Sequence, residues 1–512
     1  MLKRNYFYIF LAYVVLTFAY LSSEYIITDH QFGVPLDDSY IHYRFAENLS
    51  HGYFFHYNIG EPTPGTTSPL WVVILTVPFL FSKSAILIYS IAVSSIFFLL
   101  TCFQVYKLSK RIGFNENYAM LAVFLTLISG RLLWASLSGM EVTLFSFITL
   151  VIVNSFIGEL EKKKISYSTG ILLGISALVR PEAYLFALIY FITVIILFKN
   201  DLRTNYRNIL FSFVFFILII SPYPIFCYIN TGGLLPNTFQ GQKGGLRYIP
   251  DIIFLREAGK IFFKDNVFIL LLMFTSIGYF LFTLVKSRPE KKLLLLNLWI
   301  VLLPACLTFL LPKNNHHGRY LIPLLPFINI LSVYILVKGI EFCKKRKPGI
   351  LACRNAFVIA LFLLSFAGVV HYGYYIAMNV DNINDQHLNV ARWVEKNLPE
   401  EKIIALNDIG AISYITDKRI IDMEGLVTPD ILKIRKTEPA NQSKNFIKYL
   451  KDNDVNYLII YPSWYKSLMQ DYSYAFDTVY SARVENGTIL GDIEMFVFKI
   501  NWEKINLQKT RF

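Results

Sequence analysis

The sequence predicts a polytopic α-helical membrane protein with a C-terminal α/β domain. Three observations support this fold class. Of the 512 residues, 55% are hydrophobic and only 17% are charged, whereas soluble domains carry about 25% charged residues. The apolar runs of membrane-spanning length end near residue 378. After that point, residues 380–512 have the composition of an ordinary soluble domain.

A membrane-spanning helix needs about 20 apolar residues, and we expect eleven spans. The first has no small-residue cleavage site, so we expect it to stay as an anchor rather than to be removed as a signal peptide. The two segments on either side of Arg180 are the shortest. The expected spans are 5–27, 84–106, 117–136, 140–158, 166–180, 183–198, 208–229, 265–286, 292–312, 320–342 and 354–378.

The segment 68–82 decides the topology, because it is apolar but short and contains Pro69 and Pro78. If it does not span, every basic cluster between the spans lies on the side of the N-terminus, as the positive-inside rule requires. We therefore expect a cytoplasmic (inner) membrane protein with its N-terminus inside and its tail outside. These clusters also explain the net charge of +13. No nucleic-acid-binding motif accompanies them.

The most informative stretch follows the first predicted span and begins with the adjacent acids Asp37 and Asp38. Ionisable groups at a membrane boundary are costly and tend to be functional. Paired carboxylates can act as a general base or hold a metal. The alternative is that one of them caps the amphipathic helix that begins there. Helical spacing places Arg44 on the face of Asp37, where it either binds substrate or pairs with Asp37 or Glu47.

Further candidate residues fall in segments that the same topology places outside. The loop 58–69 is rich in turns and hydroxyl groups and precedes an apolar helix, a setting that favours anions. Asn58 and Ser68 are its candidate substrate-binding residues. Glu141 interrupts an apolar region, where it either stabilises a helix N-terminus or belongs to the site.

Arg180 lies between the two short spans, where a cation suits a lipid phosphate. Glu182, two residues later, follows Pro181 at a favourable helix start. The later loops add amide, cationic and imidazole side chains that are individually typical of solvated loops but together favour phosphate binding. They are Asn237, Lys243, His316, His317 and Arg319.

In the tail, strands alternate with helices, which is typical of a small α/β domain. We expect helices at 385–397 and 443–452, with Ser443 as the N-cap of the second. About 130 residues can hold a core of their own. The chain thus divides into a membrane domain, 1–379, with an external loop at 28–83, and an external domain, 380–512. The expected strands are 402–406, 419–422, 457–461, 475–481 and 494–499.

The order of several short motifs resembles bacterial GT-C membrane glycosyltransferases, in particular those similar to the mycobacterial arabinofuranosyltransferase AftB. The resemblance covers about residues 1–430 and is specific to the family rather than to a substrate. Its motifs are Asp37-Asp38-Ser-Tyr-Ile-His-Tyr-Arg44, Thr67-Ser68-Pro69-Leu-Trp71, Ser138-Gly-Met-Glu141, Arg180-Pro181-Glu182, Leu235-Pro-Asn237-Thr238, His317-Gly-Arg319-Tyr320 and Asn407-Asp408-Ile-Gly410.

The resemblance implies a GT-C fold and transfer of a sugar from a polyprenyl-phosphate donor to an extracytoplasmic glycan or glycolipid acceptor. It implies that the acid after the first helix, here Asp37 with Asp38 beside it, is the base and is accompanied by a divalent metal ion. It adds Asp408 to the substrate-binding candidates. We expect an inverting reaction that needs no nucleotide, in line with the absence of a Gly-rich phosphate loop.

Two other functions remain open at this level. A transporter or flippase of a lipid-linked substrate also has many spans, but it predicts Gly-broken, charged helix pairs at the middle of the membrane. A non-catalytic membrane scaffold of the same family predicts that neutralising Asp37 has no effect.

Overall fold

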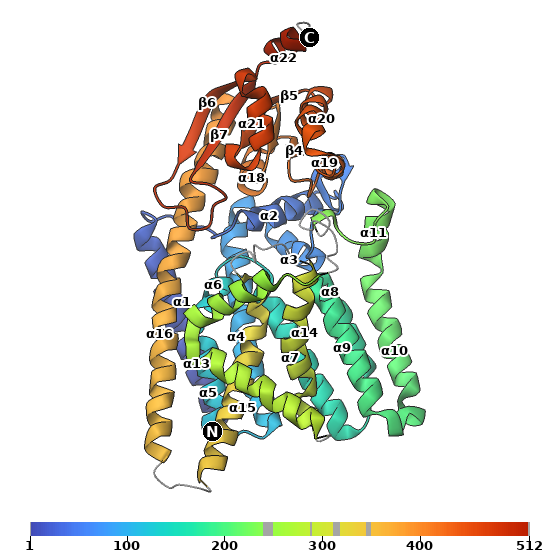
Figure 1. Cartoon of the computed structure of the whole chain (residues 1–512), viewed down its shortest axis with the longest axis vertical. Helices are drawn as coiled ribbons and strands as arrows, with labels where there is room; N and C mark the ends of the chain where they lie inside the picture. The colour runs from blue at the N-terminus through green and yellow to red at the C-terminus, as the bar shows by residue number, and fades with distance from the viewer. Residues whose placement is uncertain (1, 239–248, 287–288, 311–317, 345–349, 510–512) are drawn as a thin grey trace. The chain divides into compact units, whose positions relative to one another are not determined.

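In the computed structural model, residues 2–238, 249–286, 289–310, 318–344 and 350–509 are described (Figure 1). The chain forms two compact units. The membrane unit comprises Met1–Ser23, Ser90–Pro222 and Lys243–Tyr374. The loop-and-tail unit comprises Glu24–Tyr89, Tyr223–Gln242 and Tyr375–Phe512.

Among the described residues, eight helices or helical runs are long and apolar enough to cross a membrane. A ninth candidate is the pair α5 and α6, bent by 61°. The two remaining expected spans are the shorter helices α8 and α9, of 13 and 16 residues. The polytopic helical fold is therefore confirmed. The helices are α1 (Leu2–Ile27), α4 (Ile86–Ile112), α5 (Glu116–Leu127), α6 (Gly130–Ser136), α7 (Val142–Lys162), α8 (Tyr167–Val179), α9 (Glu182–Leu197), α10 (Leu202–Ile220), α13 (Ile252–Val285), α14 (Lys291–Leu310), α15 (Leu325–Lys344) and α16 (Ile350–Asn382).

Two expected spans differ from the observed helices by nine or more residues at one end. The span predicted at 208–229 is wrong at its end: α10 stops at Ile220, and α11 (Pro222–Thr231) begins as a separate helix. Pro222 explains the break, because proline lacks an N–H and suits the first helical position. Helix α13 starts earlier than predicted and is interrupted at Asn266, where φ is −167° and ψ is 106°.

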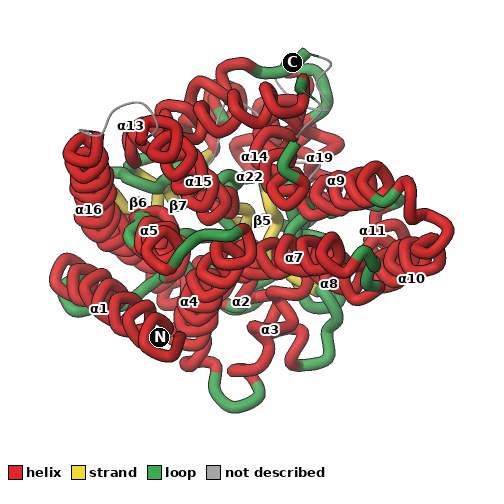
Figure 2. Tube along the Cα trace, turned by 90° about the horizontal axis from the view of Figure 1, so that it is seen from below, coloured by secondary structure: helices red, strands yellow, loops and turns green. Residues whose placement is uncertain are grey.

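Within the membrane unit, α8 lies beside α7, α9 and α10, and α14 lies beside α9 (Figure 2). Small residues allow this close packing. A Cβ atom at Gly170 in α8 would lie 1.9 Å from the carbonyl oxygen of Ser212 in α10. The α8–α10 contact therefore requires glycine at this position.

In the loop-and-tail unit, the segment after α1 forms α2 (Asp37–Ser50), the short hairpin β1 (His56–Asn58) and β2 (Glu61–Pro62), and α3 (Pro69–Phe79). Helix α3 has 11 residues, so at 1.5 Å per residue it is about 16 Å long. That length is far below the roughly 30 Å of a bilayer core. The helix alone is thus shorter than a membrane span, and the topology stays a prediction.

The tail is an α/β domain, as predicted. Its five-stranded sheet has the order β4-β3-β5-β7-β6. Strands β4, β3 and β5 are parallel, and β7 is antiparallel to both of its neighbours, β5 and β6. Buried side chains of α19, α20 and α21 pack with the strands in one hydrophobic core. The elements are α17 (Asn389–Asn397), β3 (Ile403–Leu406), α18 (Gly410–Thr416), β4 (Ile420–Asp422), α19 (Pro429–Arg435), α20 (Pro439–Asp452), β5 (Val455–Ile460), α21 (Lys466–Tyr472), β6 (Phe476–Arg483), β7 (Glu494–Ile500) and α22 (Trp502–Lys509).

The predicted N-cap of the second tail helix is wrong. Helix α20 begins at Pro439, a residue type that favours the first turn. Ser443 therefore lies inside the helix and is only 2% exposed. Its hydroxyl has no hydrogen-bond partner among the described residues.

Candidate active site

Asp37 is the first residue of α2, but its carboxylate does not cap that helix. The N-cap is Leu36, which makes no side-chain capping bond. The two oxygens of Asp37 instead accept hydrogen bonds from the backbone N–H groups of Gly410 and Ala411, each at 2.7 Å. These N–H groups open α18, so Asp37 caps a helix of the tail. The capping alternative predicted the type of contact and the wrong helix.

The contact between α2 and α18 depends on glycine at the start of α18. A Cβ atom at Gly410 would lie 2.0 Å from the Asp37 carbonyl oxygen and 2.7 Å from its Oδ2. Tyr57 also contacts the start of α18, because its hydroxyl donates to the carbonyl of Ile409 at 2.7 Å. The carboxylate of Asp37 is thereby held in one orientation.

A second acid and a histidine complete this cluster in the loop-and-tail unit. Between α16 and α17 the helix continues as a π-helix, Ile383–Leu388; such turns are rare and occur frequently at functional sites. It carries His387, which is 1% exposed and lies 3.0 Å from Asp408 (Nε2 to Oδ2). Asp408 follows β3, and its side chain is 22% exposed.

Burial raises the pKa of Asp37 to about 6, an effect that His387 partly offsets and Asp408 reinforces. The two backbone hydrogen bonds also oppose the rise. A carboxylate with a pKa near the working pH is suited to general-base chemistry. The resemblance indicated Asp37 and Asp408, whereas His387 was missed, because no sequence pattern distinguishes a π-helical turn from the helix around it.

The described residues do not supply the divalent-metal site that the resemblance implies. Among them, no group of three or more His, Cys, Asp or Glu side chains could hold a metal ion. Asp38 is partly exposed on the first turn of α2. We therefore derive no step through a metal.

Two other predicted residues of this unit make structural contacts. Arg44 is buried, pairs with Asp417, and lies 3.6 Å from Glu47; Glu47 is a partner that the structural alternative named, and Asp417 is not. Asn58 bonds the backbone of Ile420 through both ends of its amide, each at 3.0 Å. This contact attaches the β1–β2 hairpin to β4.

Ser68 lies on the loop before α3, and Asn237 lies on a later segment that contacts this loop. Both are 1% exposed. The backbone N–H of Asn237 donates to the carbonyl of Pro64 at 3.0 Å. The Ser68 hydroxyl has no partner among the described residues. The predicted residues Lys243, His316 and His317 lie outside the described residues.

In the membrane unit, the structure brings three predicted residues together. The Arg180 guanidinium donates to Glu141 and to Glu182, each at 2.7 Å, and all three side chains are less than 10% exposed. Arg180 and Arg319 also both lie 5.5 Å from the ring centre of Tyr320, an arrangement that favours cation–π attraction. Sequence spacing could indicate Glu182 as a partner of Arg180, but not Glu141.

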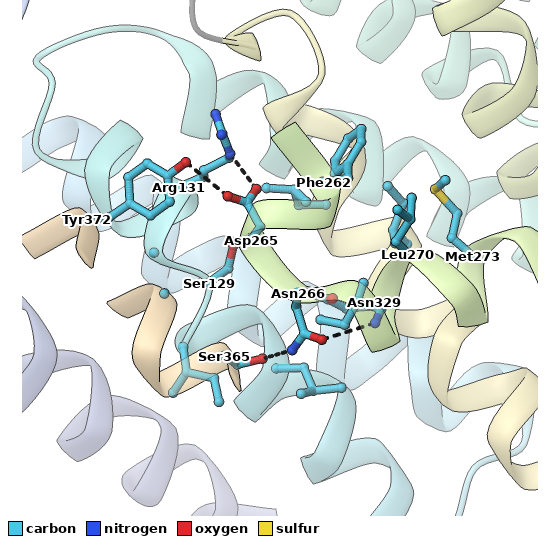
Figure 3. Close-up of a pocket in the computed structure, with 17 residues that line it drawn as sticks. Ser129, Arg131, Phe262, Asp265, Asn266, Leu270, Met273, Asn329, Ser365 and Tyr372 are labelled. Carbon is cyan, nitrogen blue, oxygen red and sulfur yellow. Dashed lines mark hydrogen bonds and ion pairs between the residues drawn. The ribbon is translucent and has the colours of Figure 1, made fainter. Parts of the chain in front are cut away.

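A second polar cluster of the membrane unit was not predicted. It lines a cavity of about 40 Å³ between the α5–α6 bend, α13, α15 and α16 (Figure 3). Arg131 pairs with Asp265, and the hydroxyl of Tyr372 donates to Asp265 at 2.9 Å. Asn266 breaks α13 here and donates to Ser365 at 2.8 Å. Irregular backbone at membrane depth is tolerated where it is buried in protein or lines a cavity.

Comparison with known proteins identifies the fold. A family model described as a domain of unknown function (DUF8728) matches residues 381–506. No curated protein matches the chain in sequence.

Solved structures with the same fold include ArnT from Cupriavidus metallidurans bound to undecaprenyl phosphate, with a TM-score of 0.59, 11% identity and coverage of 95% of this chain and 97% of that one. They also include the Archaeoglobus fulgidus oligosaccharyltransferase in complex with Zn and sulfate, with a TM-score of 0.60, 15% identity and coverage of 96% and 73%. The same enzyme tethered to an acceptor peptide gives a TM-score of 0.57, 13% identity and coverage of 97% and 74%. The chain therefore has the same fold as ArnT and the Archaeoglobus fulgidus oligosaccharyltransferase.

Proposed function

We propose that this protein is a membrane glycosyltransferase that moves a sugar from a polyprenyl-phosphate donor to an extracytoplasmic glycan or glycolipid, with inversion at the anomeric carbon. The observation that carries the proposal is the arrangement around Asp37. Its carboxylate is oriented by Gly410 and Ala411 and has a raised pKa beside His387 and Asp408. The GT-C fold supports the reaction class, because ArnT of that fold is seen with undecaprenyl phosphate.

Asp37 acts as the general base. Each carboxylate oxygen has two lone-pair sites, so the backbone N–H groups leave room for one more hydrogen bond. An acceptor hydroxyl that donates there loses its proton to Asp37 as its oxygen attacks the anomeric carbon. The bond from that carbon to the phosphate oxygen breaks in the same step, and direct displacement inverts the configuration. Asp408 binds a neighbouring hydroxyl of the acceptor, and Asp38 supports the pair.

The donor phosphate leaves as an anion, and cationic side chains stabilise it. We assign this task to Arg319, with Arg180 beside the same tyrosine ring and Lys243 as a further cation. Arg180 is held between two carboxylates, so it orients the site more than it neutralises phosphate. We therefore test Arg180 for its structural role and Arg319 for donor binding.

The reaction takes place on the outer face of the cytoplasmic membrane. This assignment rests on the basic clusters, which all fall on the side of the N-terminus when 68–82 does not span. The short length of α3 supports that condition. Resemblance to AftB-like proteins favours a cell-envelope acceptor, and it does not specify the sugar.

Glycan analysis of a deletion strain tests the function in the cell. We expect one envelope glycan to lack a terminal sugar, and wild-type protein to restore it. Asp37→Asn protein, expressed at the same level in the membrane, should not restore it. Full restoration by this variant would support a scaffold instead, and accumulation of unused lipid-linked sugar on the inner face would support a flippase.

A further inference from the structure

The tail domain contains a polar cavity that the proposed reaction does not use. It measures about 100 Å³ and lies between the segments that follow β4 and β5 and the helices α20 and α21. In sheets with parallel strands, ligands bind beyond the carboxyl ends of the strands. Glu424 follows β4, and Trp464 follows β5. Asp408 follows β3, the strand between them, so the cavity and the candidate site both lie at the carboxyl ends of the parallel strands.

The polar lining of the cavity is held in a fixed arrangement. Asp422 at the end of β4 accepts hydrogen bonds from the N–H groups of Glu424 and Val427, each at 2.8 Å, and so shapes the turn that carries Glu424. The Glu424 carboxylate accepts from the hydroxyl of Tyr465 at 2.7 Å and pairs with Arg435. The cavity therefore presents a rigid carboxylate–guanidinium pair whose charges cancel.

An aromatic platform stands at the same cavity. Trp464 is 46% exposed, and its indole N–H donates to the carbonyl of Gly491 at 3.3 Å. A Cβ atom at Gly491 would lie 2.3 Å from the ring, so the ring rests directly on backbone. A large aromatic side chain that is both fixed and open to solvent offers a flat apolar face.

The third feature is Ser443, the residue that the sequence marks as a helix cap. It lies inside α20 on the cavity wall, is 2% exposed, and has no hydrogen-bond partner among the described residues. A buried polar group without a partner costs stability. A molecule that fills the cavity can satisfy this hydroxyl.

We propose that this cavity binds one saccharide unit of the acceptor; the acceptor role, though not the binding itself, rests on the proposed function. A sugar ring has one apolar face, which suits Trp464. Its hydroxyl groups both donate and accept, which suits Glu424, Arg435 and Ser443 together. A free phosphate fits less well because the charge of Arg435 is already balanced by Glu424, which leaves the exposed Lys466 on the lining to meet it. An apolar ligand would leave these polar groups unpaired.

Direct binding to the full-length protein tests the proposal. The protein is placed in lipid nanodiscs, without sugar-based detergent or glycerol. The methyl glycosides of glucose, galactose, mannose and arabinose are tested one at a time by saturation-transfer NMR, and inorganic phosphate serves as a competitor. No donor lipid is present, so binding is measured apart from transfer.

Two variants and a matched control locate the binding. Ser443→Ala removes a hydroxyl without a partner among the described residues, so thermal stability should not fall, while affinity should drop about 2- to 12-fold if a hydrogen bond to the sugar is lost. Trp464→Leu should abolish binding. Trp393→Leu, at a tryptophan that stacks on Tyr480, should leave binding unchanged.

The proposal is overturned if none of the four glycosides binds, if phosphate displaces them competitively, or if both cavity variants bind like wild type. Sugar binding by a protein without transferase activity would contradict the proposed function alone. Transferase activity in a protein that binds no saccharide would contradict this inference alone.

Discussion

At the scale of single residues, Asp37 joins the helices α2 and α18 through its carboxylate. The sequence supports two roles for it, as a base or as a helix cap, and the contacts combine them, because the carboxylate caps α18 and keeps lone pairs for a substrate. The acid itself could be predicted from its position and family context. Its partners could not, because Gly410 lies 373 residues away in the sequence.

The pH dependence of transfer follows from the pKa of Asp37. A base must be deprotonated, so the rate should rise with pH and level off above about pH 6, rather than near pH 4 as for an ordinary aspartate. The measurement is the rate of transfer between pH 4.5 and 8 at saturating donor.

His387 provides the contrast for that profile. Its positive charge lowers the pKa of Asp37, so His387→Leu should move the acidic limb to higher pH. An unchanged limb in His387→Leu, or a wild-type limb near pH 4, would contradict the electrostatic account of the cluster.

The same raised pKa affects stability with a defined sign. Between about pH 4 and pH 6 the unfolded chain binds fewer protons at Asp37 than the folded chain does. The contribution of Asp37 to the free energy of unfolding therefore decreases as pH rises through this window. Activity and stability thus respond to pH in opposite directions at this residue.

The two arginines beside Tyr320 should respond differently to substitution. Arg319→Ala should weaken donor-lipid binding by about 1.5–3 kcal/mol if a charge-assisted hydrogen bond is lost. Arg180→Ala should mainly destabilise the fold, by about 3–5 kcal/mol, because it leaves Glu141 and Glu182 buried without their cation.

Binding of a synthetic polyprenyl phosphate and thermal unfolding, measured on both variants, separate these effects. Normal donor affinity in a folded Arg319→Ala protein would exclude the assigned role.

At the scale of elements, hydrophobic patterning predicts most helices and all five strands of the tail sheet. It fails where a backbone break is set by contacts rather than by composition. Asn266 interrupts α13 because its amide bonds Leu361 and Ser365 of α16 and caps the second half of the helix. Ser443 suggested a helix start, but Pro439 sets it four residues earlier.

The packing of α2 against α18 makes Gly410 sensitive to substitution. Gly410→Ala would drive a Cβ atom to 2.0 Å from the Asp37 carbonyl oxygen, so the helices must separate. We expect a loss of about 1–3 kcal/mol in the free energy of unfolding.

Thermal unfolding of Gly410→Ala and of a control, Gly259→Ala, checks this point. A Cβ atom at Gly259, within α13, would meet nothing within 4 Å, so alanine there should be neutral or stabilising. Equal stability of the two variants would contradict the close contact.

At the scale of the whole molecule, the topology decides whether the candidate site faces outward. Cysteines introduced at Ile59 and Ser82, both exposed, should label from outside intact cells in a background without the native cysteines. A reporter fused after Phe512 should be active only outside the cytoplasm. Labelling of position 82 from the cytoplasm alone would mean that 68–82 crosses the membrane.

The most direct test of the central claim is sugar transfer by the purified protein. Donors are synthetic polyprenyl-phosphate sugars, and the acceptor is the glycan identified in the deletion strain. Asp37→Asn keeps one acceptor oxygen for the N–H groups of α18, so thermal unfolding must first show that the variant is folded.

We predict transfer by wild type and a loss of about 10²–10⁴-fold in folded Asp37→Asn, with a smaller loss in the matched Asp38→Asn variant. Near-wild-type turnover by Asp37→Asn, with Asp38→Asn inactive, would move the base to Asp38. Full activity of both variants would contradict the account, because the acid pair would then be structural.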